Sequence, residues 1–162
     1  MTDSVALYRQ FILAEQTAAA EKRPPLSPLE IYHEYLRRQR VQDTGQLGEI
    51  VDLEGYTENC LGLTGWTTGY DIAWRNFQRN ILAPFSDRIT TEEEIVEGQQ
   101  AVVIRSRIEA THSGEFLGIP ATGRRIAWDS IAIVHVKDGR FVGQWAQPDL
   151  YGIYQQITAP EV

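Results

Sequence analysis

The sequence predicts an α+β domain, with helices in the first half of the chain and an antiparallel sheet in the second. Apolar residues recur at helical spacing up to about residue 83. From Pro84 onward, β-branched residues and tight-turn signals dominate. Helices followed by consecutive strands, rather than strands alternating with helices, are typical of α+β architecture.

The first helices are indicated by their boundary residues. An apolar stripe predicts a helix over residues 1–23, which two prolines at 24–25 would end. A second helix is expected from the Ser27 region, because Ser27 and Glu30 have the spacing of a capping box around a proline. Its apolar face should extend it to about Asp43.

A short turn is expected at residues 46–51, before a segment with three glycines. The glycine-rich residues 62–69 predict a flexible loop that leads into a further helix. That helix should begin at about Tyr70, where the amphipathic pattern starts. The loop lacks the glycine and lysine spacing of nucleotide-binding loops, so no nucleotide cofactor is expected.

Two hairpins and a short helix are predicted in the second half. The first hairpin should span residues 87–111 and the second residues 125–147. Asp138-Gly139 joins the strands of the second hairpin, and this dipeptide accepts the positive φ angles of a type I′ turn. A short helix is expected from about Asp149.

Composition and charge narrow the possible function classes. The chain has 162 residues, 43% hydrophobic and 23% charged, which suits one globular core. A net charge of −7 argues against non-specific nucleic-acid binding. The sequence shows neither a signal peptide nor an apolar run of membrane-spanning length, so a cytoplasmic protein that does not enter membranes is expected. The single Cys60 cannot form an intrachain disulfide.

The residue types point to acid/base chemistry by carboxylates and imidazoles. The three histidines, His33, His112 and His135, do not have the spacing of metal ligands, so no metal is expected. Cys60 has no local nucleophile signature, and no nucleophile-elbow serine is present.

Asp149 and His135 each permit two interpretations from pattern alone. Asp149 lies where a strand passes into a helix, so it could simply cap that helix. His135 alternates with Ile131 and Ile133 along its strand, which is typical of a hydrogen-bonded structural histidine. Either residue could instead serve in acid/base catalysis.

Residues 111–125, with the sequence THSGEFLGIPATGRR, resemble a signature of the SnoaL-like polyketide cyclases. The segments 137–145 and 149–157 resemble the final hairpin and the C-terminal helix of that family. Ala121 stands where the family usually has proline, which concerns the geometry of the loop. The resemblance covers about residues 28–157 and is specific in the last third.

The resemblance implies a cone-shaped, curved antiparallel sheet wrapped around N-terminal helices. Nuclear transport factor 2, ketosteroid isomerase and scytalone dehydratase share this α+β barrel. Residues 27–162 would form that domain, and residues 1–26 would be an N-terminal helical extension. In relatives of this fold the outer sheet face commonly packs against another subunit, so a homodimer is expected.

The resemblance also implies a site. Asp149 would be the acid/base residue of a cofactor-free aldol ring closure, with His135 beside it and Asn59 as a polar pocket residue. Isomerisation, dehydration or hydrolysis could use the same groups. All three should meet in an enclosed, apolar pocket for an oxygenated small molecule, where burial raises the pKa of Asp149. The aromatic residues expected to line that pocket are Tyr32, Trp66, Trp74, Phe116, Trp128 and Trp145.

A non-catalytic interpretation of the same fold remains open. The domain could bind an apolar ligand without turning it over, or serve only for dimerisation, with Asp149 as a helix cap. The two interpretations predict different geometry. An enzyme should bring Asp149, His135 and Asn59 to one cavity, whereas a scaffold could leave Asp149 bonded to backbone and facing solvent.

Overall fold

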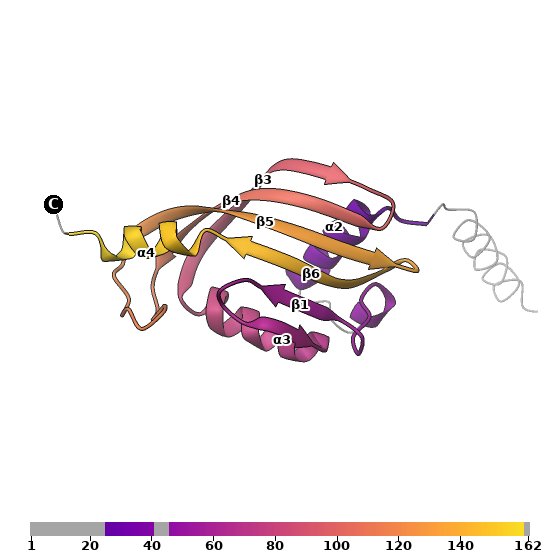
Figure 1. Ribbon diagram of the computed structural model, residues 1–162, viewed down its shortest axis with the longest axis horizontal. Coiled ribbons are helices and arrows are strands. Elements are labelled where there is room, and N and C mark those ends of the chain that lie inside the picture. The colour runs from indigo at the N-terminus through magenta and orange to yellow at the C-terminus, as the bar shows by residue number, and fades with distance from the viewer. Residues whose placement is uncertain (1–24, 41–45, 161–162) are drawn as a thin grey trace, which may run out of the picture.

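The computed structural model describes residues 25–40 and 46–160, which fold as an α+β domain (Figure 1). The fold class predicted from the sequence is therefore confirmed. The predicted helix over residues 1–23 lies outside the described residues. The helical elements are α2 (Pro28–Arg40), a 3₁₀ turn (Leu47–Glu49), α3 (Tyr70–Phe77), a π-helical turn (Gln78–Leu82) and α4 (Leu150–Thr158).

Six strands of the described chain form one curved, unclosed sheet in the order β2-β1-β6-β5-β4-β3. Their bounds are β1 (Thr57–Cys60), β2 (Gly65–Thr68), β3 (Phe85–Glu97), β4 (Ala101–His112), β5 (Arg125–Lys137) and β6 (Arg140–Pro148). Neighbouring strands are antiparallel except β1 and β6, which run parallel.

The structure confirms the predicted capping box, type I′ turn and hairpins. Ser27 Oγ accepts from the backbone N–H of Glu30 at 3.3 Å, and Glu30 Oε2 accepts from the N–H of Ser27 at 2.8 Å, which completes the capping box. Asp138 and Gly139 have φ angles of 50° and 74°, as a type I′ turn requires. Both long hairpins are present as β3–β4 and β5–β6.

The expectation for residues 62–69 was partly wrong, because these residues include a strand. β1 and β2 form a short hairpin that adds to the edge of β6. Neither strand has the alternating apolar pattern that reveals a strand in sequence. Their extended conformation is stabilised by pairing with β6, which is distant in sequence.

The sheet has an inner face covered by helices and an outer face without a helical layer among the described residues. α2 crosses the inner face behind β4, β5 and β6 (Figure 1). One apolar cluster packs under α2 and includes Ile31, Ile104 and Phe141. A second cluster packs at the other end of the sheet, where α4 contributes Ile153.

Candidate functional site

Glu58 is a buried carboxyl group on the inner face of the sheet. It belongs to β1, where its register partner on β6 is Gln144. Its side chain accepts from Gln144 Nε2 at 2.9 Å and from the Tyr56 hydroxyl at 3.4 Å. With 6% of its surface exposed, Glu58 is among the few buried charged residues of the described chain. A carboxyl group in this position is unusual, because Glu is rarely buried without a cationic partner.

Tyrosines surround Glu58 on the inner face. The Tyr70 hydroxyl donates to the Tyr35 hydroxyl at 3.3 Å, and Gln39 Nε2 donates to the Tyr70 hydroxyl. The rings of Tyr56 and Tyr70 pack edge to face with centroids 5.5 Å apart. The carboxyl group of Glu58 acts electrostatically on both Tyr35 and Tyr70.

Burial raises the pKa of Glu58 above its ordinary value, although hydrogen bonds from Gln144 and Tyr56 partly oppose this. Burial also raises the pKa of Tyr35 and Tyr70, and raises the pKa of Cys60 to about 11. These three neighbours therefore stay neutral at pH 7. The pKa of Glu58 is shifted from the ordinary carboxyl value toward neutral pH, so Glu58 is the member of this cluster that suits general acid/base chemistry.

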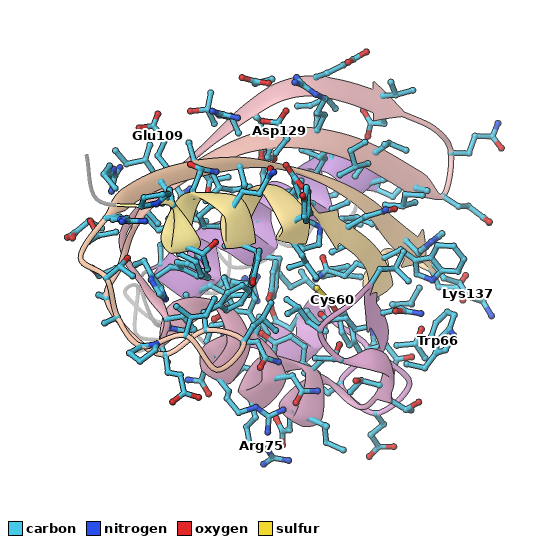
Figure 2. The ribbon with its side chains drawn as sticks, turned by 60° about the vertical axis from the view of Figure 1, so that its left-hand side comes forward. Cys60, Trp66, Arg75, Glu109, Asp129 and Lys137 are labelled. Atoms are coloured by element: carbon cyan, nitrogen blue, oxygen red, sulfur yellow. The ribbon has the colours of Figure 1, made fainter. Side chains whose placement is uncertain are left out.

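Small side chains occupy the middle of the inner face between the two apolar clusters. The residues there are Ser106, Ser130, Ala132 and Ala146. All four are partly exposed, whereas the larger inner-face residues on either side, such as Trp128 and Val134, are buried. Cys60, which neighbours Glu58 on the same face, points into this interior in Figure 2. The polar centre of the inner face thus lies beside its smallest residues.

Asp149 is exposed and caps α4. Its Oδ1 accepts from the backbone N–H of Gly152 at 2.8 Å, and its own N–H donates to the carbonyl of Asp129 at 2.9 Å. A side chain at position 152 would collide with the Asp149 carboxylate, because an added Cβ would lie 2.1 Å from Oδ2. The helix-cap interpretation is therefore confirmed, and the expected enclosure of Asp149 is wrong.

His135 is exposed on the outer face, near the opposite end of β5 from Asp149. It pairs with Gly143, whereas the residue before Asp149 pairs with Ser130. Five residues of strand place His135 and Asp149 roughly 16 Å apart along the sheet. An open pocket of about 380 Å³ includes the His135 side chain; its other lining residues are Thr57, Gln100, Val136, Lys137, Val142 and Gly143.

Asn59, Trp66 and Trp145 form a row on the outer face, since each is the register partner of its neighbour. The indole centroids lie 5.6 Å apart, although the backbones of β2 and β6 are separated by two strand spacings, roughly 9–10 Å. The two rings therefore lean together over Asn59, whose Oδ1 is buried without a hydrogen-bond partner in the described part of the chain. Trp66 and Trp145 are 65% and 46% exposed, so they do not line the enclosed pocket that was expected.

The other predicted pocket residues lie on the inner side. Trp128 and Phe116 are each 3% exposed and belong to the apolar cluster beneath α4. Tyr32 and Trp74 are partly buried and pack against the cluster beneath α2. Of these four residues, only Tyr32 and Trp74 therefore lie at the end of the inner face that holds the Glu58 cluster.

Asp149, His135 and Asn59 do not converge, and the inner carboxyl group was missed in the sequence. The polar run Thr57-Glu58-Asn59-Cys60 was the available signal. Had it been interpreted as a strand, alternation would have placed positions 58 and 59 on opposite faces. Only the pairing with β6 could decide which of these two side chains points into the core.

Residues 25–40 and 46–160 contain no group of three or more His, Cys, Asp or Glu side chains that could hold a metal ion. Nor does this part of the chain contain a helix long and apolar enough to cross a membrane.

Residues 31–157 match the family described as SnoaL-like polyketide cyclase. An aklanonic acid methyl ester cyclase from Streptomyces peucetius, DnrD, is 32% identical over 77 residues, which is 47% of this chain and 53% of DnrD. AcmA from Streptomyces galilaeus, of the same description, is 29% identical over 56% of this chain and 59% of AcmA. The chain thus aligns with little more than half the length of these curated relatives.

Solved structures show the same fold. A SnoaL-like protein from Jannaschia sp. CCS1 superposes with a TM-score of 0.68 at 19% identity, over 86% of this chain and 99% of that one. IdmH from Streptomyces antibioticus superposes with a TM-score of 0.63 at 24% identity, over 80% of this chain and 97% of IdmH. At such identities the likeness concerns the fold.

Proposed function

Because the chain belongs to the SnoaL-like polyketide cyclase family, we propose that it catalyses an intramolecular carbon–carbon ring closure with Glu58 as the acid/base group. The substrate would be an apolar, oxygen-rich small molecule bound on the inner face of the sheet. The observation that carries this proposal is the buried carboxyl group of Glu58, with its raised pKa and its ring of neutral tyrosines.

The proposed reaction is an isomerisation that needs one proton carrier. The Glu58 carboxylate removes a proton from a carbon next to a carbonyl group, which leaves an enolate. The enolate carbon attacks a second carbonyl carbon of the same molecule, forming the new bond as that carbonyl becomes an alkoxide. The alkoxide takes the proton back from Glu58. No electrons are gained or lost, so the step needs no redox partner.

The surroundings of Glu58 favour both halves of this proton transfer. A raised pKa makes the carboxylate a stronger base and brings it closer to neutral pH, where general acid/base catalysis is most effective. Gln144 donates to Glu58 and holds its orientation. Tyr35 and Tyr70 supply neutral hydroxyl groups that could stabilise a developing enolate oxygen.

The test uses aklanonic acid methyl ester, the compound named for the curated relatives. Cyclisation yields a product of unchanged mass and altered chromatographic retention. Glu58→Gln keeps the shape of the side chain but cannot carry the proton, so turnover should fall about 10²- to 10⁴-fold. Glu54→Gln, at an exposed position, is the matched control and should retain turnover.

The Asp149→Asn variant tests whether Glu58 or Asp149 is the acid/base group. Asn caps helices as well as Asp does, so the variant should fold and retain turnover if Asp149 only caps α4. Loss of turnover in Asp149→Asn, with Glu58→Gln active, would move the acid/base role to Asp149. A wild-type protein that binds the probe without converting it would favour the non-catalytic binding module.

We also propose that the outer face joins two copies of the chain. One residue from each strand forms a continuous outer row: Trp66, Asn59, Trp145, Ile133, Val103 and Val96. Trp66, Trp145 and Val96 are 65%, 46% and 59% exposed, so this row presents apolar surface to solvent.

Charged residues beside the outer row support a second copy as the occupant. Arg105 and Arg107 form ion pairs with Asp129 at 3.1 and 2.9 Å, so both signs of charge lie together on this face. Asp129 points away from the interior in Figure 2. A two-fold contact places the same surface against itself, and a surface with apolar residues and both charges is complementary to its own copy.

A further inference from the structure

Two neighbouring rows of residues on the outer face differ in height. The first is the outer row, which carries Trp66 and Trp145. The second lies two residues away along each strand, and strand alternation keeps it on the same face. We call it the groove row, because all of its residues except the histidine are small. Its members are Thr68, Thr57, Gly143, His135, Ala101 and Gly98.

Gly143 sets the floor of the groove row beside Trp145. A Cβ at position 143 would lie 2.1 Å from the backbone carbonyl oxygen of Thr57, so this position cannot carry a side chain without a shift of the backbone. Thr57, Gly143 and His135 also line the open pocket of about 380 Å³ on this face. A hollow therefore lies two residues from an exposed tryptophan on the same strand.

Trp66 and Trp145 form the highest part of the outer row. Their indoles are 65% and 46% exposed, with ring centroids 5.6 Å apart, so they make one projecting block above Asn59. Trp66 points away from the interior in Figure 2. Tryptophan is enriched at protein–protein interfaces relative to the rest of the surface. The block thus has the composition of an interface anchor.

Neither row contains Asp, Glu, Lys or Arg. The charged groups of this face lie around the two rows, with Arg105, Arg107 and Asp129 on one side and Lys137 on the other. An uncharged, aromatic centre inside a charged rim is the usual anatomy of a protein–protein interface. A second copy presents the same uncharged centre, so neither copy buries a carboxylate, an ammonium group or a guanidinium against it.

A two-fold axis that runs along the rows, midway between them, makes this surface complementary to itself. Rotation about that axis turns two sheets face to face and exchanges the two rows, while each strand stays opposite its own copy. Trp145 then faces the partner's Gly143, and Trp66 faces the partner's Thr68. The strands of the two sheets remain aligned, as in sheets that pack face to face about 10 Å apart.

We propose that two copies of this chain pack in this arrangement, with the outer row of each copy seated in the groove row of the other. The inference rests on the proposed outer-face dimer and fixes which residues meet within it. It assigns the open pocket beside His135 to Trp145 of the partner subunit. An axis through the outer row itself would instead set the two tryptophan blocks against each other and leave both groove rows empty.

Exchange of Trp66 and Thr68 tests the arrangement. Both side chains are exposed on the edge strand β2, so their substitution should leave the fold intact. Trp66→Thr empties the contact and Thr68→Trp sets indole against indole, so each should raise the dimer Kd about 30-fold or more in sedimentation equilibrium. The Trp66→Thr/Thr68→Trp double variant exchanges projection and hollow in both copies, and should recover about tenfold or more of the lost affinity.

Mixing the two single variants gives a second measurement that does not need the double variant. In a mixed dimer, both indoles of the Thr68→Trp chain at these positions face threonines of the Trp66→Thr chain, so the clash and the void both disappear. Native mass spectrometry should therefore show the mixed dimer in clear excess over either homodimer. A purely statistical mixture would overturn the arrangement.

Exchange of Ile89 and Thr91 is the matched control. These residues lie two positions apart on the same face of the other edge strand, β3, outside both rows. The Ile89→Thr/Thr91→Ile variant should keep the wild-type Kd.

Two results separate this inference from the dimer itself. A dimeric wild type whose Kd is unchanged by either single exchange, or whose double variant is no tighter than the single variants, would overturn the arrangement and leave the outer-face dimer intact. A monomeric wild type would refute the dimer and this arrangement with it.

Discussion

Charged and apolar side chains have opposite environments on the inner and outer faces of the sheet. On the outer face, Asp129 meets Arg105 and Arg107 in solvent, and hydrogen bonds from Arg107 lower the pKa of Asp129. On the inner face, Glu58 has no cationic partner and Arg88 has no anionic one among the described residues. Uncompensated charges next to a core cost stability, and such groups are typical of sites that act on a ligand.

Large apolar side chains are buried on the inner face and partly exposed on the outer face. Phe141 on the inner face is fully buried, whereas Trp145, four residues along the same strand, is 46% exposed. An irregularity in the β5–β6 register between Phe141 and Gly143 places these two side chains on opposite faces, and the outer face lacks a covering layer in the described chain. This difference supports the two proposals, a ligand on the inner face and a second copy of the chain on the outer face.

Replacing Phe141 with Ala should give the largest loss of stability. Phe141 is 0% exposed, and its ring packs against Tyr35 and Tyr56 with centroids 5.1 and 5.2 Å away. We expect the free energy of unfolding to fall by about 3–5 kcal/mol in chemical denaturation. Ile89→Ala, on the outer face and 57% exposed, should cost less than about 1 kcal/mol. Similar losses for both variants would remove the contrast between the faces.

Ile133→Asp tests the outer face as an interface. Ile133 lies near the middle of the outer row, so a charge there would be buried without a partner in the dimer and should weaken association by about 2–5 kcal/mol. Light scattering should show a dimer for the wild type and a monomer for the variant at micromolar concentration. Ile89→Asp, on the same face but outside the row, should remain dimeric. A monomeric wild type would refute the proposed interface.

The pH dependence of stability tests the inner face. Because the folded-state pKa of Glu58 is raised, its contribution to stability is fully present below its ordinary pKa and is lost as pH rises through the folded-state value. The wild type should therefore lose stability relative to Glu58→Gln over that window, by at most about 1.4 kcal/mol per pH unit for one proton. Denaturation curves at several pH values measure the difference. Parallel pH profiles of the two proteins would show that Glu58 is not perturbed.

Asp149→Ala should give the smallest of these effects. Loss of the hydrogen bond to the Gly152 N–H should lower the free energy of unfolding by about 1 kcal/mol, and Asp149→Asn should lower it less. Thermal denaturation of the two variants compares the costs. Equal costs for Ala and Asn would show that the capping bond contributes little, and would make a functional role for Asp149 more attractive.

The amino-acid sequence by itself determined the features that depend on neighbouring residues. The capping box at Ser27, the start of α3 at Tyr70 and the Asp138-Gly139 turn are local signals, and each was found where predicted. The separation of helices from long strands followed from hydrophobic periodicity. Asp149 was also correctly anticipated as a possible helix cap.

Only the tertiary structure decided which side chains face the interior. Asn59 and Glu58 are adjacent in sequence, and the pairing of β1 with β6 sends the first outward and the second inward. A β-bulge in β3, where Asp87 and Arg88 lie opposite the single Ala110, likewise brings Arg88 over the ring of Phe77. Burial and charge compensation are set by such distant contacts. The pKa of Glu58 and the unpaired state of Arg88 therefore could not be inferred from local pattern.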